Sequence, residues 1–203
     1  MTAPARARAV PRPVARLLVL VGVALVLSGC AAGPECDRIP GVRPGVCPLP
    51  VADRQPAPDV TLPVLPSAAG VASGVTELSL ADLTGRVVIV NFWASWCGPC
   101  RIEQPDLNQV HDLLPDTEVV LIGVNIEDTQ ANALAHLTEF DVAYLSLFDP
   151  VNDLAGRFSG IGARTIPTTI FLDPEGRVAA RLLGLTDTRE IVALADAVVD
   201  EVG

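Results

Sequence analysis

The sequence predicts an α/β domain in which helices cover both faces of a central mixed β-sheet. The segments VVIVNFW (87–93) and EVVLIGVNI (118–126) are apolar and rich in β-branched residues, which is typical of central strands buried on both faces. A segment with a helical pattern follows each of them, as expected where helices pack on a sheet. TTIFLD (168–173) and RVAARLLG (177–184), joined by the turn PEG, predict a terminal hairpin, and this hairpin makes the sheet mixed.

The chain before the first central strand is expected to form only short elements. APDVTLPVL (57–65) predicts an edge strand that leads into the domain, and TELSL (76–80) alternates like a strand. LADLTGR (80–86) predicts a turn. From residue 31 to about residue 74, proline and glycine recur so often that no sustained helix is expected.

Four helices are expected after the first central strand, and the first begins at the CGPC motif. The second is amphipathic, with Asp128 or Thr129 as its cap. His111 and His136 lie on these two helices, and both side chains are expected to be solvated. The predicted helices span about residues 97–114, 128–140, 149–158 and 188–202.

The first 29 residues predict a targeting segment. Four arginines precede the apolar run LLVLVGVALVL (17–27), which is too short to span a bilayer and fits a secretory signal. The sequence LSGC (27–30) then resembles the lipobox of bacterial lipoproteins, whose cysteine is acylated and becomes the first residue after cleavage. This resemblance implies lipidation of Cys30 and an extracytoplasmic protein that is lipid-anchored in the cell membrane. An uncleaved membrane helix over residues 17–32 is the alternative.

The chain is therefore expected to have three parts: a lipoprotein signal peptide (1–29), an extracytoplasmic Pro/Gly-rich tether (30–56) and the folded domain (57–203). The formal net charge is −10, and a chain that begins at Cys30 keeps 10 arginines against 24 acidic residues. Such a surface repels phosphate groups, so we exclude nucleic acid as a partner.

The motif CGPC places Cys97 and Cys100 two residues apart. A structural zinc site is disfavoured, because Cys30, Cys36 and Cys47 supply no second ligand pair at metal spacing, and we expect no metal and no cofactor. A permanent staple is also disfavoured, because such a short loop removes little chain entropy.

A redox couple explains the motif better. Cys97 follows a buried strand and opens a helix, where unpaired backbone amides and the helix dipole favour the thiolate. Pro99 suits the first turn, where an amide is not needed. Cys100 lies one turn inside, so we expect Cys97 to attack a substrate disulfide and Cys100 to resolve the mixed disulfide.

FWASWCGPC (92–100) and TIPTT (165–169) resemble the active site and the cis-proline loop of thioredoxins. The resemblance covers about residues 57–202 and implies a thioredoxin-like fold. It also implies a cis bond before Pro167, which would pack beside the two sulfurs. Ile166 precedes this proline, as in reductive members, and Trp96 is expected at the rim of the substrate groove.

Within this superfamily the chain is similar to the TlpA/ResA group of membrane-anchored thiol-disulfide oxidoreductases. The lead-in APDVTLP with LSLADLTGR resembles the group's N-terminal hairpin, and Asn91 stands where thioredoxins carry a buried aspartate. Glu103 stands where the group has an active-site glutamate. The long segment 118–149 matches the group's extra helix and strand.

Glu103 is the candidate proton acceptor for Cys100. Asn91 cannot take a proton, whereas Glu103 lies on the same helix three residues after Cys100. The alternative is a surface acid that only stabilises the N-terminal end of the helix.

Two other activities on related folds fit the sequence less well. A peroxiredoxin-type peroxidase requires proline seven residues, and threonine or serine three residues, before its reactive cysteine, where this chain has Val90 and Ala94. A copper-binding protein of the same fold uses CxxxC with a distant histidine, and no histidine follows His136. Thiolates can still bind Cu(I), so a copper-binding protein stays as an alternative.

The resemblance implies protein disulfides as substrates, apocytochrome c among them, and a membrane electron donor. Gly-Pro between the cysteines lacks the histidine of strongly oxidising members, which favours a reductant. An oxidase of secreted-protein thiols remains the alternative. Cys36 and Cys47 are expected to form a structural disulfide because the compartment is oxidising, with free thiols or an auxiliary redox pair as alternatives.

Overall fold

The computed structural model describes residues 39–114, 117–158 and 165–201. Five strands form a mixed sheet in the order β5-β4-β3-β6-β7. The central strand β3 pairs parallel with β4 and antiparallel with β6. The sequence-based prediction of an α/β fold with a mixed sheet is therefore confirmed. The strands of the sheet are β3 (Val87–Trp93), β4 (Val119–Ile126), β5 (Ser146–Asp149), β6 (Thr168–Leu172) and β7 (Val178–Leu183).

Strand β3 is buried along its whole length because it has packed layers on both faces. Val87, Ile89 and Trp93 point into one apolar cluster, whereas Val88, Val90 and Phe92 point into the other. This alternation is the period of two of a β-strand. The continuous apolar run in the sequence therefore reflects a strand whose two faces pack into two separate apolar clusters.

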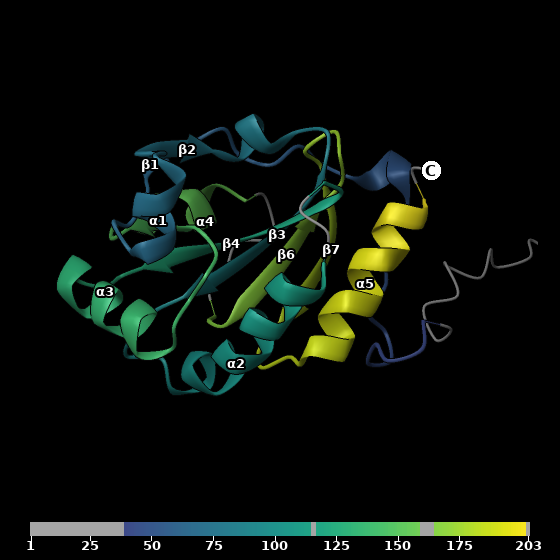
Figure 1. Ribbon diagram of the computed structural model, residues 1–203. Coiled ribbons are helices and arrows are strands. Elements are labelled where there is room, and N and C mark those ends of the chain that lie inside the picture. Colours follow the sequence, from purple (N-terminus) through teal and green to yellow (C-terminus); the bar gives the residue numbers. More distant parts are fainter. Residues whose placement is uncertain (1–38, 115–116, 159–164, 202–203) are drawn as a thin grey trace, which may run out of the picture. The chain divides into compact units, whose positions relative to one another are not determined.

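Helices cover both faces of the sheet, and Figure 1 shows α2 and α5 side by side on one of them. Helices α2, α3 and α5 contribute their buried apolar residues to the first cluster, and α4 and the 3-10 turn η3 contribute theirs to the second. The helices are α1 (Ala68–Ser73), α2 (Gly98–Leu113), α3 (Gln130–Glu139), α4 (Asp153–Arg157) and α5 (Thr188–Asp200), with 3-10 turns η2 (Val51–Asp53) and η3 (Leu80–Leu83).

The short helix α1 was not expected. It lies within the proline-rich segment, but no proline occurs between Pro66 and Gly74. The Ser67 hydroxyl accepts a hydrogen bond from the Gly70 amide, and Gly74 ends the helix with a φ of 68°. A capping serine and a terminal glycine are therefore enough for a six-residue helix here. Strands β1 (Thr61–Pro63) and β2 (Glu77–Ser79) flank it as an antiparallel pair.

The described part of the expected tether, residues 39–56, packs against the domain. The Leu49 amide donates to the Ala179 carbonyl at 2.6 Å, and the Val178 amide donates to the Gln55 carbonyl at 2.8 Å. The segment therefore satisfies backbone groups of β7, an edge strand that would otherwise lack partners on this side. The buried guanidinium of Arg54 contacts Asp173 and Glu201, and it joins the segment to β6 and α5.

None of the described helices is long and apolar enough to cross a membrane. The apolar run 17–27 and the lipobox lie outside the described residues.

Candidate active site

Cys97 and Cys100 lie at the point where β3 passes into α2. Cys97 is the N-cap of α2, and its sulfur accepts a hydrogen bond from the Cys100 amide at 3.2 Å. The two cysteines form a disulfide with each other. Cys97 is 5 % exposed and Cys100 is 2 % exposed, whereas Gly98 and Pro99 between them are exposed. Both cysteines are thus buried in the disulfide form, and Cys97 lies at the positive end of the α2 dipole.

The cis-proline loop reaches the same end of the sheet. The Ile166–Pro167 peptide bond is cis, as the resemblance to thioredoxins implies. Thr168, the next residue, pairs with Phe92 of β3, so Pro167 lies near the end of β3 from which the chain enters the CGPC motif. The Pro167 carbonyl accepts a hydrogen bond from the Gly184 amide at 2.9 Å. The loop after β7 thus supports the proline.

The aromatic and aliphatic side chains near the motif differ in exposure. Trp96 is 59 % exposed, and its indole N–H donates to the Glu127 carbonyl at 2.9 Å. Trp93 is buried in the core, where its indole N–H donates to the Ser146 hydroxyl. Ile166 is half-buried and packs against both apolar clusters. An exposed, fixed aromatic ring beside the disulfide suits contact with a protein partner.

Glu103 lies on the buried face of α2, one turn after Cys100. Its side chain is completely buried. Its Oε1 accepts from the Asn91 side-chain amide at 2.8 Å, and its Oε2 accepts from the Thr186 backbone amide at 3.3 Å. The Asn91 amide also donates to the Thr169 hydroxyl at 3.1 Å. The alternative of a surface acid at the helix end is therefore wrong.

The surroundings of Glu103 favour its protonated form more than water does. Burial raises the pKa of its carboxyl group to about 7, although the hydrogen bonds from Asn91 and Thr186 oppose this shift. A carboxyl group that titrates near neutral pH can both accept and release a proton under working conditions. Glu103 thus has the chemistry of a general base beside a thiol pair.

His136 is buried, so the expectation that its side chain is solvated was wrong. It is 2 % exposed, stacks on Trp93 with ring centroids 4.5 Å apart, and lies 3.2 Å from the Gln104 carbonyl oxygen. Burial and the nearby Arg101 charge lower its pKa to about 4, so the ring is neutral near pH 7. The spacing of Ala133, His136 and Leu137 is that of a buried helix face, a signal that was present in the sequence. His111 is half-buried.

Of the remaining predicted site residues, the structure describes only some. Cys47 is disulfide-bonded, whereas its expected partner Cys36 and the expected lipidation residue Cys30 lie outside the described residues. Among the described residues, no cluster of three or more histidine, cysteine or acidic side chains could hold a metal ion. Three further polar residues at the site, Thr186, Glu190 and Arg43, carry no recognisable motif and were missed.

Comparison with known proteins identifies relatives along most of the chain. Residues 54–181 match the model of the AhpC/TSA family. The thiol:disulfide interchange protein HelX of Rhodobacter capsulatus is 33% identical over 174 residues, which are 85% of this chain and 88% of HelX. The thiol:disulfide interchange protein DsbE of Pseudomonas fluorescens is 37% identical over 133 residues, 63% of this chain and 71% of DsbE. A secreted thiol-disulfide isomerase from Corynebacterium glutamicum has the same fold, with a TM-score of 0.65 and 33% identity over 76% of this chain and 92% of that one.

The buried carboxyl group predicts a pH-dependent effect of Glu103→Gln on stability. Because the folded-state pKa of about 7 exceeds the ordinary value of 4.5, wild-type stability is lost as the pH rises from about 4.5 through 7. The neutral variant lacks this loss. We expect Glu103→Gln to increase the free energy of unfolding of the oxidised protein at pH 8, on the order of 2–3 kcal/mol, and to change it little at pH 5.

Urea unfolding at the two pH values measures this difference. Glu175→Gln, a change at an exposed acid on the β6–β7 turn, is the control and should have little effect at either pH. An equal effect of Glu103→Gln at pH 5 and pH 8 would contradict the raised pKa.

Proposed function

Because the chain belongs to the AhpC/TSA family and to the family of the thiol:disulfide interchange protein HelX, we propose that it is a protein thiol-disulfide oxidoreductase. One observation carries the proposal: the Cys97–Cys100 disulfide lies at the start of α2, and a buried carboxyl group follows Cys100 one turn later on the same helix. Cys97 and Cys100 are the reacting groups. No bound cofactor takes part in the proposed exchange.

The reaction proceeds by two thiol-disulfide exchanges. The Cys97 thiolate attacks one sulfur of a substrate disulfide, a Cys97–substrate bond forms, and the other substrate sulfur leaves as a thiolate. The Cys100 thiolate then attacks the Cys97 sulfur, the Cys97–Cys100 bond forms, and the second substrate sulfur leaves. The substrate gains two electrons, and the enzyme ends in the disulfide state of the structure. A dithiol protein returns two electrons for the next cycle.

Glu103 takes the Cys100 proton before the second exchange. Asn91 holds the carboxylate through its amide at 2.8 Å and cannot take the proton itself. After the exchange, Glu103 returns the proton to a leaving thiolate or to water. This role depends on a pKa near neutrality, which lets the carboxyl group both accept and release the proton.

Peroxidase activity is less well supported. Val90 and Ala94, at the positions where a peroxiredoxin pocket needs proline and a hydroxyl side chain, are both completely buried. Neither side chain presents a hydrogen-bonding group to a peroxide. The relatives reported above are named for thiol-disulfide chemistry, which agrees with this difference.

We further propose that the protein works outside the cytoplasm, anchored through Cys30, and that it reduces disulfides of proteins such as apocytochrome c. The lipobox supports the anchor, and the similarity to the TlpA/ResA group supports the substrate class. A reductant in an oxidising compartment needs an electron supply, and a membrane electron-transfer protein is the donor that fits this position.

The roles of the two cysteines predict different trapping behaviour. Cys100→Ala should accumulate covalent adducts with substrate proteins, because nothing then resolves the mixed disulfide. Cys97→Ala should trap few substrates and reduce none, because Cys100 lies inside α2 and lacks the N-cap position that favours the Cys97 thiolate. Mass spectrometry of adducts under non-reducing conditions measures both. Equal trapping by the two variants would overturn the assignment of Cys97 as the nucleophile.

The direction of electron flow predicts a low reduction potential for the Cys97–Cys100 couple. We expect a value nearer that of thioredoxin, about −270 mV, than that of the oxidant DsbA, about −120 mV. Equilibration with glutathione or dithiothreitol buffers, followed by alkylation, gives the potential. A value close to that of DsbA would support the alternative, an oxidase of secreted-protein thiols.

The proposed anchor predicts that processing depends on Cys30. Wild-type protein should partition with membranes, and Cys30→Ala should remain unprocessed and keep its leader. Fractionation and intact-mass measurement after expression in a bacterial host test both points. Normal cleavage of the Cys30→Ala precursor would reject the lipobox interpretation.

A further inference from the structure

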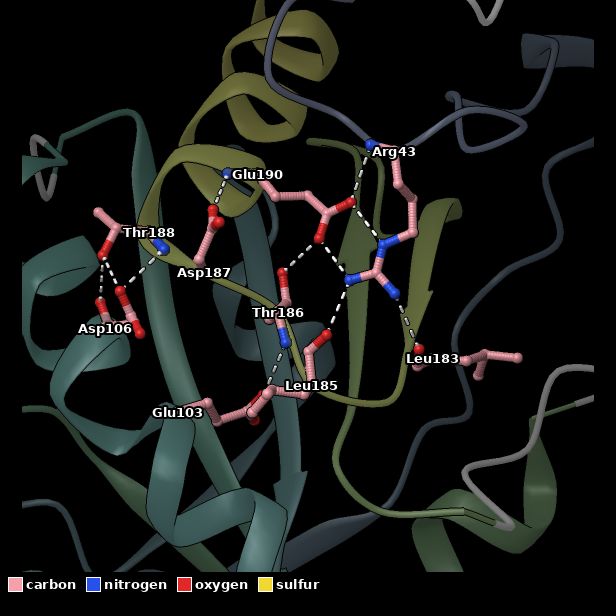
Figure 2. A network of polar contacts seen from close by, with 9 residues as sticks. All are labelled: Arg43, Glu103, Asp106, Leu183, Leu185, Thr186, Asp187, Thr188 and Glu190. Atoms are coloured by element: carbon pink, nitrogen blue, oxygen red, sulfur yellow. Dashed lines mark hydrogen bonds and ion pairs between the residues drawn. The ribbon is translucent and has the colours of Figure 1, made fainter.

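Arg43 lies in the segment expected to be a tether, yet its side chain binds the first turn of α5. The Arg43 backbone amide and Nε both donate to Glu190 Oε1, at 3.0 and 2.6 Å, and an Nη2 contact to Oε2 completes a bidentate pair. Glu190 is almost completely buried, so its charge needs this partner. Figure 2 shows the guanidinium facing both Glu190 and the loop that precedes α5.

The same guanidinium also holds the loop between β7 and α5. Nη2 donates to the Leu185 carbonyl at 2.8 Å, and Nη1 donates to the Leu183 carbonyl at 3.3 Å. These two carbonyls flank Gly184, whose φ of 77° suits glycine. One side chain thus fixes three points of a short connection: two loop carbonyls and the carboxylate of Glu190.

That loop supplies a hydrogen bond to each of two active-site elements. The Gly184 amide donates to the carbonyl of the cis-proline Pro167 at 2.9 Å. The Thr186 amide donates to Glu103, and the Thr186 hydroxyl donates to Glu190 at 2.9 Å. A continuous chain of contacts therefore runs from Arg43 through Glu190 and Thr186 to Glu103 (Figure 2).

We propose that Arg43 is a positioning residue for the active site. Through the β7–α5 loop it holds the Thr186 amide against Glu103 and the Gly184 amide against Pro167. The segment preceding the predicted domain is then part of the catalytic apparatus. The catalytic role of this positioning rests on the proposed function, whereas the contacts of Arg43 can be tested without any enzymatic activity.

Arg43 acts on Glu103 through its positive charge as well as through its contacts with the loop. Asp106 raises and Arg43 lowers the pKa of Glu103. Near pH 7, loss of the Arg43 charge leaves Glu190 uncompensated, and both changes disfavour an ionised Glu103. Apart from the two cysteines, the ionisable groups that face Glu103 or its partners belong to four parts of the chain. They are Asp106 of α2, Tyr144 before β5, Asp187 and Glu190 at the start of α5, and Arg43.

The two ends of the ion pair should shift the titration of Glu103 in opposite directions. In Arg43→Gln, we expect the Glu103 midpoint to rise by roughly 0.5 pH unit or more, because a positive charge is lost. In Glu190→Gln, we expect it to fall, because a negative charge is lost while Arg43 remains. A purely structural role would loosen the same loop in both variants and could not produce opposite signs.

The midpoint is measured by carbon-13 NMR of oxidised protein labelled at glutamate carboxyl groups, with the Glu103 signal assigned from its absence in Glu103→Gln. Arg43→Lys keeps the charge but not the forked contacts to Glu190, Leu183 and Leu185, so it should raise the midpoint less than Arg43→Gln does. Arg177→Gln is the matched control: Arg177 also pairs with carboxylates, but it lies on the β6–β7 turn, at the opposite end of the sheet from Cys97. It should leave the midpoint unchanged.

The second readout separates this inference from the proposed function. The rate at which Cys100 resolves a mixed disulfide is measured against pH by stopped flow. Arg43→Gln should move the ascending limb of the profile to higher pH, and Glu103→Gln should remove the part that follows the Glu103 midpoint and leave only the rise caused by ionisation of the Cys100 thiol itself. An unchanged NMR midpoint in Arg43→Gln, or shifts of one sign in both variants, would overturn the inference. A limb in Glu103→Gln that stays at the wild-type pH would instead reject Glu103 as the proton acceptor and leave the NMR result intact.

Discussion

The structure depends on one constraint: a carboxyl group that titrates near neutral pH is kept out of water beside a disulfide. Burial disfavours the ionised form of Glu103, and only a few fixed donors offset this cost. Asn91 supplies one of them from the central strand. A second acid at position 91 would place two carboxyl groups together in the core, where one would have to stay protonated. With asparagine at position 91, Glu103 is the one carboxyl group at this contact, which agrees with its proposed role as proton acceptor.

The sheet order brings the donors together from distant parts of the chain. Asn91 of β3 pairs with Thr169 of β6, and Thr169 pairs with Leu182 of β7. Pro167 comes directly before β6, and Gly184 comes directly after β7. A backbone hydrogen bond joins these two residues just beyond the paired ends of the strands. Register alone therefore places the cis-proline loop and the β7–α5 loop at the end of the sheet where β3 enters α2. The chemistry of the site follows from the pairing of three strands.

The sequence predicts those parts of the fold and site that depend on local pattern. Strand β3 and helix α2 follow from an apolar run and from a cysteine at a helix start. Glu103 follows from its spacing to Cys100 together with the resemblance to the TlpA/ResA group. Strand β5 is short and has no pattern of its own, so only the resemblance to a family implied it. Arg43 and Arg54 gave no signal, because their partners are more than a hundred residues away. The contacts of Arg43 and the burial of Arg54 require β7 and α5 to be in place, and these exist only once the sheet has formed. His136 differs, because its helical spacing marked it as buried, and the general rule that histidines are solvated was the weaker argument.

The packing of residues 39–56 also changes what an anchor at Cys30 would do. A free tether up to residue 56 would let the active site move far from a bilayer. Because Arg43, Leu49 and Arg54 bind the domain, only the chain between Cys30 and Ile39 would link an anchor at Cys30 to the first described residue. Nine residues span at most about 30 Å even when fully extended. An anchor at Cys30, as proposed above, would hold Ile39 within that distance of the bilayer. Of the contacts that shorten the tether, those of Arg43 also hold the loop that donates to Glu103, whereas those of Leu49 and Arg54 bind β7, Asp173 and Glu201.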